Sequence, residues 1–165
     1  MSTETVWGLI GVFVGGAIPW LEAIFVIPAG IIAGLPALPV GNAGATGNIL
    51  TIGLAAYAGE WFRQRWVAFR RRRSAEKGED AQERARKAAK AEHRQQRVVR
   101  VMDRGGLPLL SFLSPFIGTQ LCAVAAVAIG TRATPTFVWI SAMTVLWCIV
   151  AAWATLAGFA FFTDA

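Results

Sequence analysis

Three long stretches of this chain carry no ionisable charge, and they limit its possible folds more than any other feature. They are Ala23–Gly59, Gly105–Thr131 and Ala133–Thr163. Each is longer than the roughly 20 apolar residues needed to cross about 30 Å of hydrocarbon. The chain has 55% hydrophobic residues and a mean hydropathy of +0.50. These values are typical of an integral membrane protein rather than a small soluble domain.

The positive charge of the chain is concentrated in one segment. Fifteen Lys and Arg and six Asp and Glu lie between Arg63 and Arg104. Loops rich in Lys and Arg remain on the cytoplasmic side of a membrane. We therefore expect a protein of the cell membrane whose basic loop lies in the cytoplasm. We do not expect a nucleic-acid-binding surface.

One carboxylate stands alone in the first apolar region. Glu22 is the single charge between Thr5 and Gly59. A carboxylate at membrane depth costs about 2.5–3.5 kcal/mol on insertion scales, so it marks a functional site by default. Burial favours the protonated form of a carboxyl group, which suits Glu22 to carry a proton or bind a cation. The alternative is an acid at the membrane interface beside Trp20.

The first membrane half covers residues 1–73. Its N-terminal segment is apolar and glycine-rich, and the sequence leaves open whether it spans the membrane or lies at the interface. Five prolines and glycines follow between Trp20 and Val40. Those are too many helix breakers for one straight helix, so residues 20–40 are predicted to form a re-entrant hairpin. A spanning helix is predicted over residues 42–70.

The second membrane half covers residues 105–165 and follows a basic helical loop at 74–104. It repeats the same order, with a hairpin predicted at 105–131 and a spanning helix at 136–163. Interrupted segments in corresponding positions of two halves indicate an inverted repeat of the kind found in secondary transporters. The predicted fold is therefore all-α and membrane-integral, with two inverted-topology halves.

The hairpin tips are expected to form the substrate site. Proline and glycine place these tips at Pro28–Gly30 and Ser114–Gln120. Half-helices that start after a tip direct their N-terminal N–H groups inward, which suits an anionic headgroup. The alternative is a pair of proline-kinked spanning helices. The candidate substrate-binding residues are Pro28, Gly30, Asn48, Ser114, Pro115, Gly118, Thr119, Gln120 and Arg132. Arg132 is either a partner for a substrate phosphate or for Glu22, or an anchor at the interface.

Several short motifs resemble the family of small multidrug export proteins, a distant branch of the DedA/VTT superfamily. They are Pro19-Trp-Leu-Glu22, Ile27-Pro-Ala-Gly30, Gly34-Leu-Pro36, Gly47-Asn-Ile49 and Pro115-Phe-Ile-Gly-Thr119. The resemblance implies two re-entrant hairpins that face each other across the membrane. It also implies proton-dependent transport of lipid-like or amphiphilic substrates, such as a polyprenyl-phosphate carrier lipid. The basic insert 70–96 lies outside the resemblance. Family members often carry an arginine two positions after the acid, where this chain has Ile24.

These observations predict a small membrane transporter for an anionic lipid carrier or an amphiphilic compound, with protons coupled through Glu22. The second hypothesis is a membrane scaffold or regulator that uses its cationic loop to bind anionic lipid or a cytosolic partner. The sequence contains no HExxH, no GxSxG and no Cys/His ligand set, so we expect neither an enzyme nor a metal or other cofactor. Membrane lipids and further copies of the chain are the expected partners.

Overall fold

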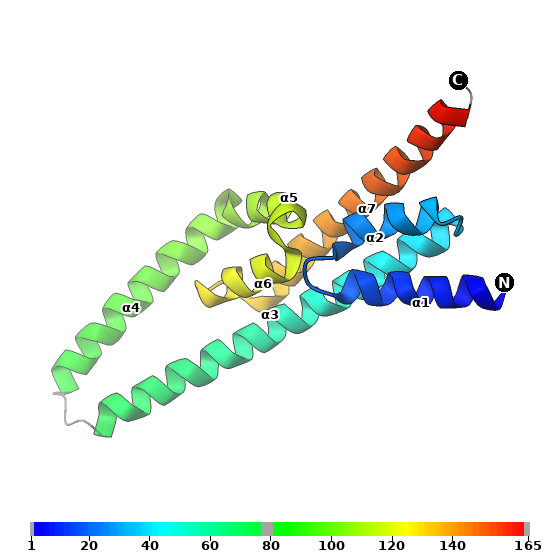
Figure 1. Ribbon diagram of the computed structural model, residues 1–165. Helices are drawn as coiled ribbons and strands as arrows, with labels where there is room; N and C mark the ends of the chain where they lie inside the picture. The colour runs from blue at the N-terminus through cyan, green and yellow to red at the C-terminus, as the bar shows by residue number, and fades with distance from the viewer. Residues whose placement is uncertain (1, 77–80, 164–165) are drawn as a thin grey trace.

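The chain folds into helices joined by short turns (Figure 1). The structure, a computed structural model, describes residues 2–76 and 81–163, and these residues form no strand. The elements are α1 (Thr3–Ala17), α2 (Glu22–Ile32), α3 (Ala37–Glu76), α4 (Ala81–Val101), a π-helical turn (Met102–Gly106), α5 (Leu107–Ile117), α6 (Thr119–Ala128) and α7 (Ala133–Thr163).

Four short helices form two hairpins that point toward each other. In Figure 1, α1 runs from the N-terminus to the middle of the molecule, and α2 returns toward the same end. The second hairpin enters from the opposite end, where α5 runs inward and α6 runs back. The long helices α3 and α7 pack beside both hairpins. The start of α1 and the end of α7 therefore lie at the same end of the molecule.

The turns that follow α2 and α6 have the same hydrogen bonds. Leu35 N–H donates to the Gly30 carbonyl, and Thr131 N–H donates to the Ala126 carbonyl, both at 3.1 Å. In each turn a glycine in the left-handed region, Gly34 or Gly130, ends the helix, as in a Schellman motif. Each residue of the first turn precedes its equivalent in the second by 96 positions.

The same interval relates two pairs of prolines. Pro19 and Pro115 lie 96 positions apart, as do Pro39 and Pro135. Pro39 and Pro135 each occupy the third residue of a long helix, α3 and α7. Proline is tolerated in the first turn because no N–H is needed there. The interval of 96 positions therefore relates both the prolines and the turn hydrogen bonds of the two halves.

Close packing between α1 and α3 depends on two glycines. A Cβ added to Gly16 would meet the backbone of Gly44, and one added to Gly47 would meet the backbone of Phe13. Small residues at such crossings allow helix backbones to approach closely. The first hairpin is thereby held against the first part of α3.

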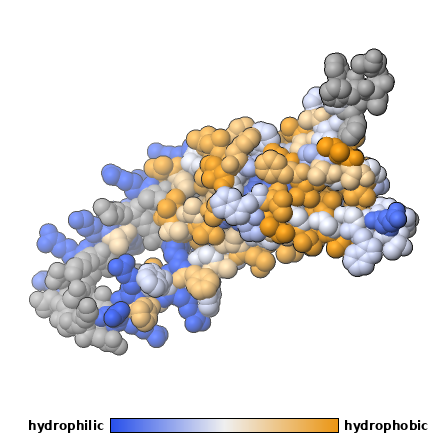
Figure 2. All heavy atoms as spheres, viewed as in Figure 1, coloured by the Kyte–Doolittle hydropathy of each residue, from blue (hydrophilic) through white to orange (hydrophobic). Residues whose placement is uncertain are grey.

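The outer surface of the helical body is strongly apolar. Large side chains such as Trp7, Trp20, Leu38, Phe116 and Trp153 are more than two-thirds exposed. Figure 2 shows hydrophobic side chains over the hairpins and α7, and hydrophilic ones along the parts of α3 and α4 that extend beyond the hairpins. Among the described residues, one helix is long and apolar enough to cross a membrane, at Ala133–Gly158.

The prediction for the first hairpin was wrong in its position. Pro28 and Gly30 lie inside the continuous helix α2, whereas the chain reverses at residues 18–21. Ile18 adopts an extended conformation (ψ 126°), as expected for a residue that precedes a proline. The N-terminal segment, α1, therefore forms one arm of this hairpin. The bend of the second hairpin, at Gly118, falls within the predicted tip.

Candidate functional site

Glu22 lies at the tip of the first hairpin, where the backbone is strained. It is 2% exposed and is the first residue of α2. Its φ is +41°, and that of Trp20 is +81°. Residues other than glycine rarely adopt a positive φ, and each such residue costs about 1–3 kcal/mol of backbone strain. Strain of this kind persists only where surrounding contacts hold it, and Glu22 makes those contacts.

The tip of the second hairpin supplies the partner of Glu22. Thr119 N–H donates to Glu22 Oε1 over 2.5 Å, and the Thr119 hydroxyl lies 3.1 Å from the same oxygen. Thr119 is the first residue of α6, after Gly118 with φ +117°. The backbone bend at Gly118 leaves this N–H without an intrahelical acceptor. The carboxylate therefore occupies the positive end of the α6 dipole.

A polar cluster continues from Thr119 to α3. The Thr119 hydroxyl lies 3.0 Å from Asn48 Oδ1 and 3.1 Å from Gln120 Oε1. Gln120 Nε2 donates to Asn48 Oδ1 and to the Thr51 hydroxyl, both at 3.1 Å. The Thr119 hydroxyl has one proton for three neighbouring oxygens, including that of Glu22. The hydrogen bonds of this cluster can therefore rearrange when Glu22 gains or loses a proton.

The other carboxylate oxygen faces a small cavity. Glu22 Oε2 and the Thr144 hydroxyl are both buried and have no hydrogen-bond partner among the described residues. A cavity of about 10 Å³ lies against them. It is lined by Glu22, Ile24, Asn48, Pro115, Thr119, Thr144, Trp147 and Cys148. Its size is close to the minimum for one water molecule, so the cavity has room for at most one water beside Oε2.

The structure brings together about half of the predicted site residues. Thr119 hydrogen-bonds Glu22, and Asn48 and Gln120 form hydrogen bonds with Thr119. Pro115 lines the small cavity and Gly118 forms the bend. The other predicted residues lie elsewhere or are occupied within their own helices.

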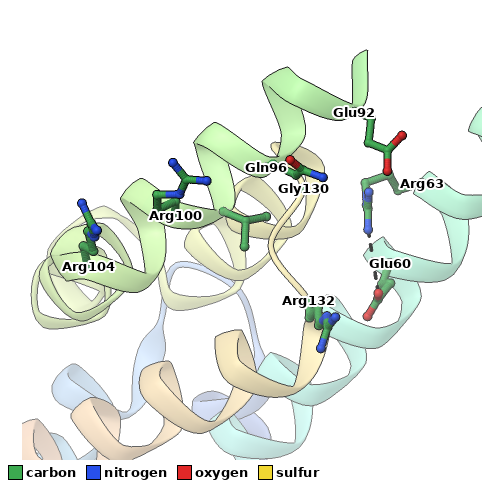
Figure 3. A pocket seen from close by; sticks show the side chains of 9 residues that line it. Glu60, Arg63, Glu92, Gln96, Arg100, Arg104, Gly130 and Arg132 are labelled. Atoms are coloured by element: carbon green, nitrogen blue, oxygen red, sulfur yellow. Dashed lines mark ion pairs between the residues drawn. The ribbon is translucent and has the colours of Figure 1, made fainter. Parts of the chain in front are cut away.

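Four predicted residues form no hydrogen bond with Glu22 in the part of the chain that the structure describes. The Ser114 hydroxyl donates to the Ser111 carbonyl over 2.7 Å, within α5. Gly30 packs against Val12 and Val40, and Pro28 lies in the middle of α2. Arg132 lies just before α7 and lines a different pocket, together with residues of α3 and α4 (Figure 3). Among the described residues, Glu22 has no ion pair.

Two members of the site were not predicted from the sequence. Thr51 accepts from Gln120 and lies one turn after Asn48. Thr144 reaches the small cavity from α7. Thr144 follows Asn48 by 96 positions, the interval that relates the prolines of the two halves. That interval is the signal that could have identified it.

Comparison of the chain with protein-family models, with curated proteins and with solved structures finds no match.

Proposed function

We propose that this chain is a multi-pass protein of the cell membrane, with two inverted-topology halves and a cytoplasmic basic loop. The lengths of the hairpin helices support this. At 1.5 Å per residue, α2 and α6, with 11 and 10 residues, extend roughly 15–17 Å. That is half of the hydrocarbon thickness, so each hairpin enters from one face and ends near the midplane. Irregular backbone is tolerated at that depth where protein covers it.

We further propose that the protein transports an anionic lipid carrier, such as a polyprenyl phosphate, or an amphiphilic compound. One observation carries this proposal, namely that the buried Glu22 carboxylate occupies the N-terminus of α6 where the two hairpin tips meet. A helix N-terminus binds phosphate and other anions. In this conformation Glu22 takes the place of such an anion at Thr119.

Protonation of Glu22 is the proposed coupling step. Hydrogen bonds to a charged group contribute about 1.5–3 kcal/mol each, compared with about 0.5–1.5 kcal/mol for neutral ones. A proton on the carboxyl group therefore weakens its contacts with Thr119, which offset the backbone strain at Trp20 and Glu22. The first tip is then free to move, and the α6 N-terminus becomes accessible to an anionic headgroup.

Flux measurements on reconstituted protein test this function. Vesicles that contain the full chain are loaded with farnesyl phosphate, a short polyprenyl phosphate, and a pH gradient is imposed. We expect farnesyl phosphate efflux to depend on the gradient in the native protein and to be lost in Glu22→Gln. Equal flux with and without the gradient, or native flux in the variant, would contradict coupling through Glu22. Absence of flux in the native protein would contradict transport of this class of substrate.

The second hypothesis is a membrane scaffold or regulator that acts through its basic loop. It is favoured by α4, a helix of 21 residues with many Lys and Arg that extends away from the apolar body in Figure 1. Such a helix can bind anionic lipid at about 1 kcal/mol per basic residue near the surface. A scaffold needs this helix but does not need the ionisation of Glu22, so the two hypotheses differ in which change abolishes activity.

A further inference from the structure

A second, larger pocket lies away from the cluster around Glu22. Its volume is about 730 Å³. It is formed by α3, by α4 and by the turn between α6 and α7 (Figure 3). It is lined by Glu60, Arg63, Glu92, Gln96, Val99, Arg100, Arg104, Gly130 and Arg132. None of these residues belongs to the cluster around Glu22, so the pocket is a separate site.

The lining has an excess of positive charge. Four arginines face two glutamates, which leaves a formal charge of +2. One glutamate is already engaged, because Glu60 Oε2 accepts from Ala133 N–H over 2.8 Å and Glu60 Oε1 lies 3.8 Å from Arg63. Among the side chains that the structure describes, Arg100, Arg104 and Arg132 form no ion pair. The arginines therefore have more donors than the pocket has acceptors.

Arg63 adds a specific reason to expect an anion. Its Nε is buried and has no hydrogen-bond partner among the described residues, and an unsatisfied buried donor costs about 1–3 kcal/mol. Arginine presents its donors in a planar fork that matches phosphate oxygens. We propose that this pocket binds a phosphate monoester or inorganic phosphate, whose charge of nearly −2 balances the excess of the lining.

The pocket also lies at the base of the second hairpin. Arg104 precedes Gly105, whose φ of +150° marks a kink just before α5. Gly130 and Arg132 follow α6. Arg104 and Arg132 therefore lie at the two ends of the second hairpin, on opposite sides of the pocket (Figure 3). This site goes beyond the proposed transport, and its binding can be measured whether or not the protein transports anything.

Binding to the full chain tests the proposal with two probes, one for each source of phosphate. Nanodiscs of phosphatidylcholine that also contain phosphatidic acid present a lipid phosphomonoester. Inorganic phosphate presents the soluble form to the detergent-solubilised protein. Nanodiscs with phosphatidylglycerol, an anionic phosphodiester, measure attraction to negative surface charge alone. Binding is read from hydrogen exchange of α4 and of residues 102–106, together with titration calorimetry for inorganic phosphate.

The variants compare arginines inside and outside the pocket. Arg104→Gln/Arg132→Gln removes two pocket charges, whereas Arg72→Gln/Arg97→Gln removes two exposed charges elsewhere on α3 and α4. All four side chains are exposed, so both proteins are expected to fold, and their melting temperatures are compared with that of the native chain. We expect the pocket variant to bind at least about tenfold more weakly, since charge-assisted hydrogen bonds are lost, and the control to change less than about twofold.

The outcomes distinguish the source of the phosphate. Protection by phosphatidic acid alone identifies a lipid headgroup, and heat of binding with inorganic phosphate identifies a soluble ligand. Either result, lost in the pocket variant, supports the proposal. Equal protection by phosphatidylglycerol, equal loss in both variants, or no binding of either probe would overturn it.

Discussion

The main-chain N–H of Thr119 donates to the carboxylate of Glu22 over 2.5 Å, although 97 positions separate the two residues in the sequence. This contact joins the tips of the two hairpins inside the molecule. The contact offsets the backbone strain at Glu22 in the first half, and it gives the Thr119 N–H in the second half a hydrogen-bond acceptor. Most of the proposed function depends on this contact.

Glu22→Gln separates ionisation from packing. Glutamine keeps the size of the side chain and an oxygen for Thr119 N–H, but it cannot release a proton. Removal of a desolvated charge makes membrane insertion easier by up to about 3 kcal/mol. We therefore expect normal insertion and assembly with loss of proton-linked flux. The measurement is flux in reconstituted vesicles, with the amount of inserted protein determined in parallel. Native flux and pH dependence would identify Glu22 as a structural residue only.

Gly47→Ala is predicted to destabilise the contact between α1 and α3. The added methyl group would meet the backbone of Phe13 and Ala17, which cannot move aside as a flexible side chain can. Overpacking of this kind costs about 1–3 kcal/mol. Gly11→Ala is the matched control, because no atom lies within 4 Å of the added Cβ. Alanine there is expected to be neutral or stabilising by up to about 1 kcal/mol. Thermal unfolding in detergent compares them, and equal melting temperatures would contradict the packing.

The hairpin arrangement predicts that both ends of the chain lie on the side opposite the basic loop. A spanning N-terminal segment would instead place the start of the chain in the cytoplasm with the loop. A reporter that is active only in the cytoplasm is fused to either end, with the same reporter in the 74–104 loop as the positive control. We expect signal from the loop alone. A signal from the N-terminal fusion would favour the spanning segment, and one from the C-terminal fusion would contradict the second hairpin.

Replacement of residues 75–96 by a neutral linker distinguishes a transporter from a scaffold. Arg63, Arg65 and Arg70–Arg73 remain and still hold the loop on the cytoplasmic side. We expect farnesyl phosphate flux to persist, because no residue near Glu22 is altered. Phosphate binding is expected to weaken, because the replacement removes most of α4, the helix that carries Arg100 in the lining of that pocket. Complete loss of activity in a correctly inserted protein would favour the scaffold.

The sequence alone determined the helical class and several element boundaries, because these depend on local chemistry. Pro19 ends α1 through its steric effect on Ile18. At position 118 the φ of +117° is one that only glycine adopts without strain. The predicted helix at 136–163 is confirmed within α7, which starts three residues earlier. The lone charge of Glu22 was visible in the sequence, and its burial is confirmed.

The tertiary structure decided which helix breakers act as turns and what Glu22 contacts. By local chemistry alone, Pro28 and Gly30 disfavour a helix as strongly as Pro19 does. The helix α2 nevertheless continues through both of them. Gly30 packs there against Val12 and Val40, contacts that no local pattern contains. Thr119 reaches Glu22 from α6, and Asn48 and Gln120 form hydrogen bonds with Thr119. Hydrogen bonds between distant segments depend on how the helices pack, and hydrophobic periodicity specifies which face is buried but not which polar group it meets.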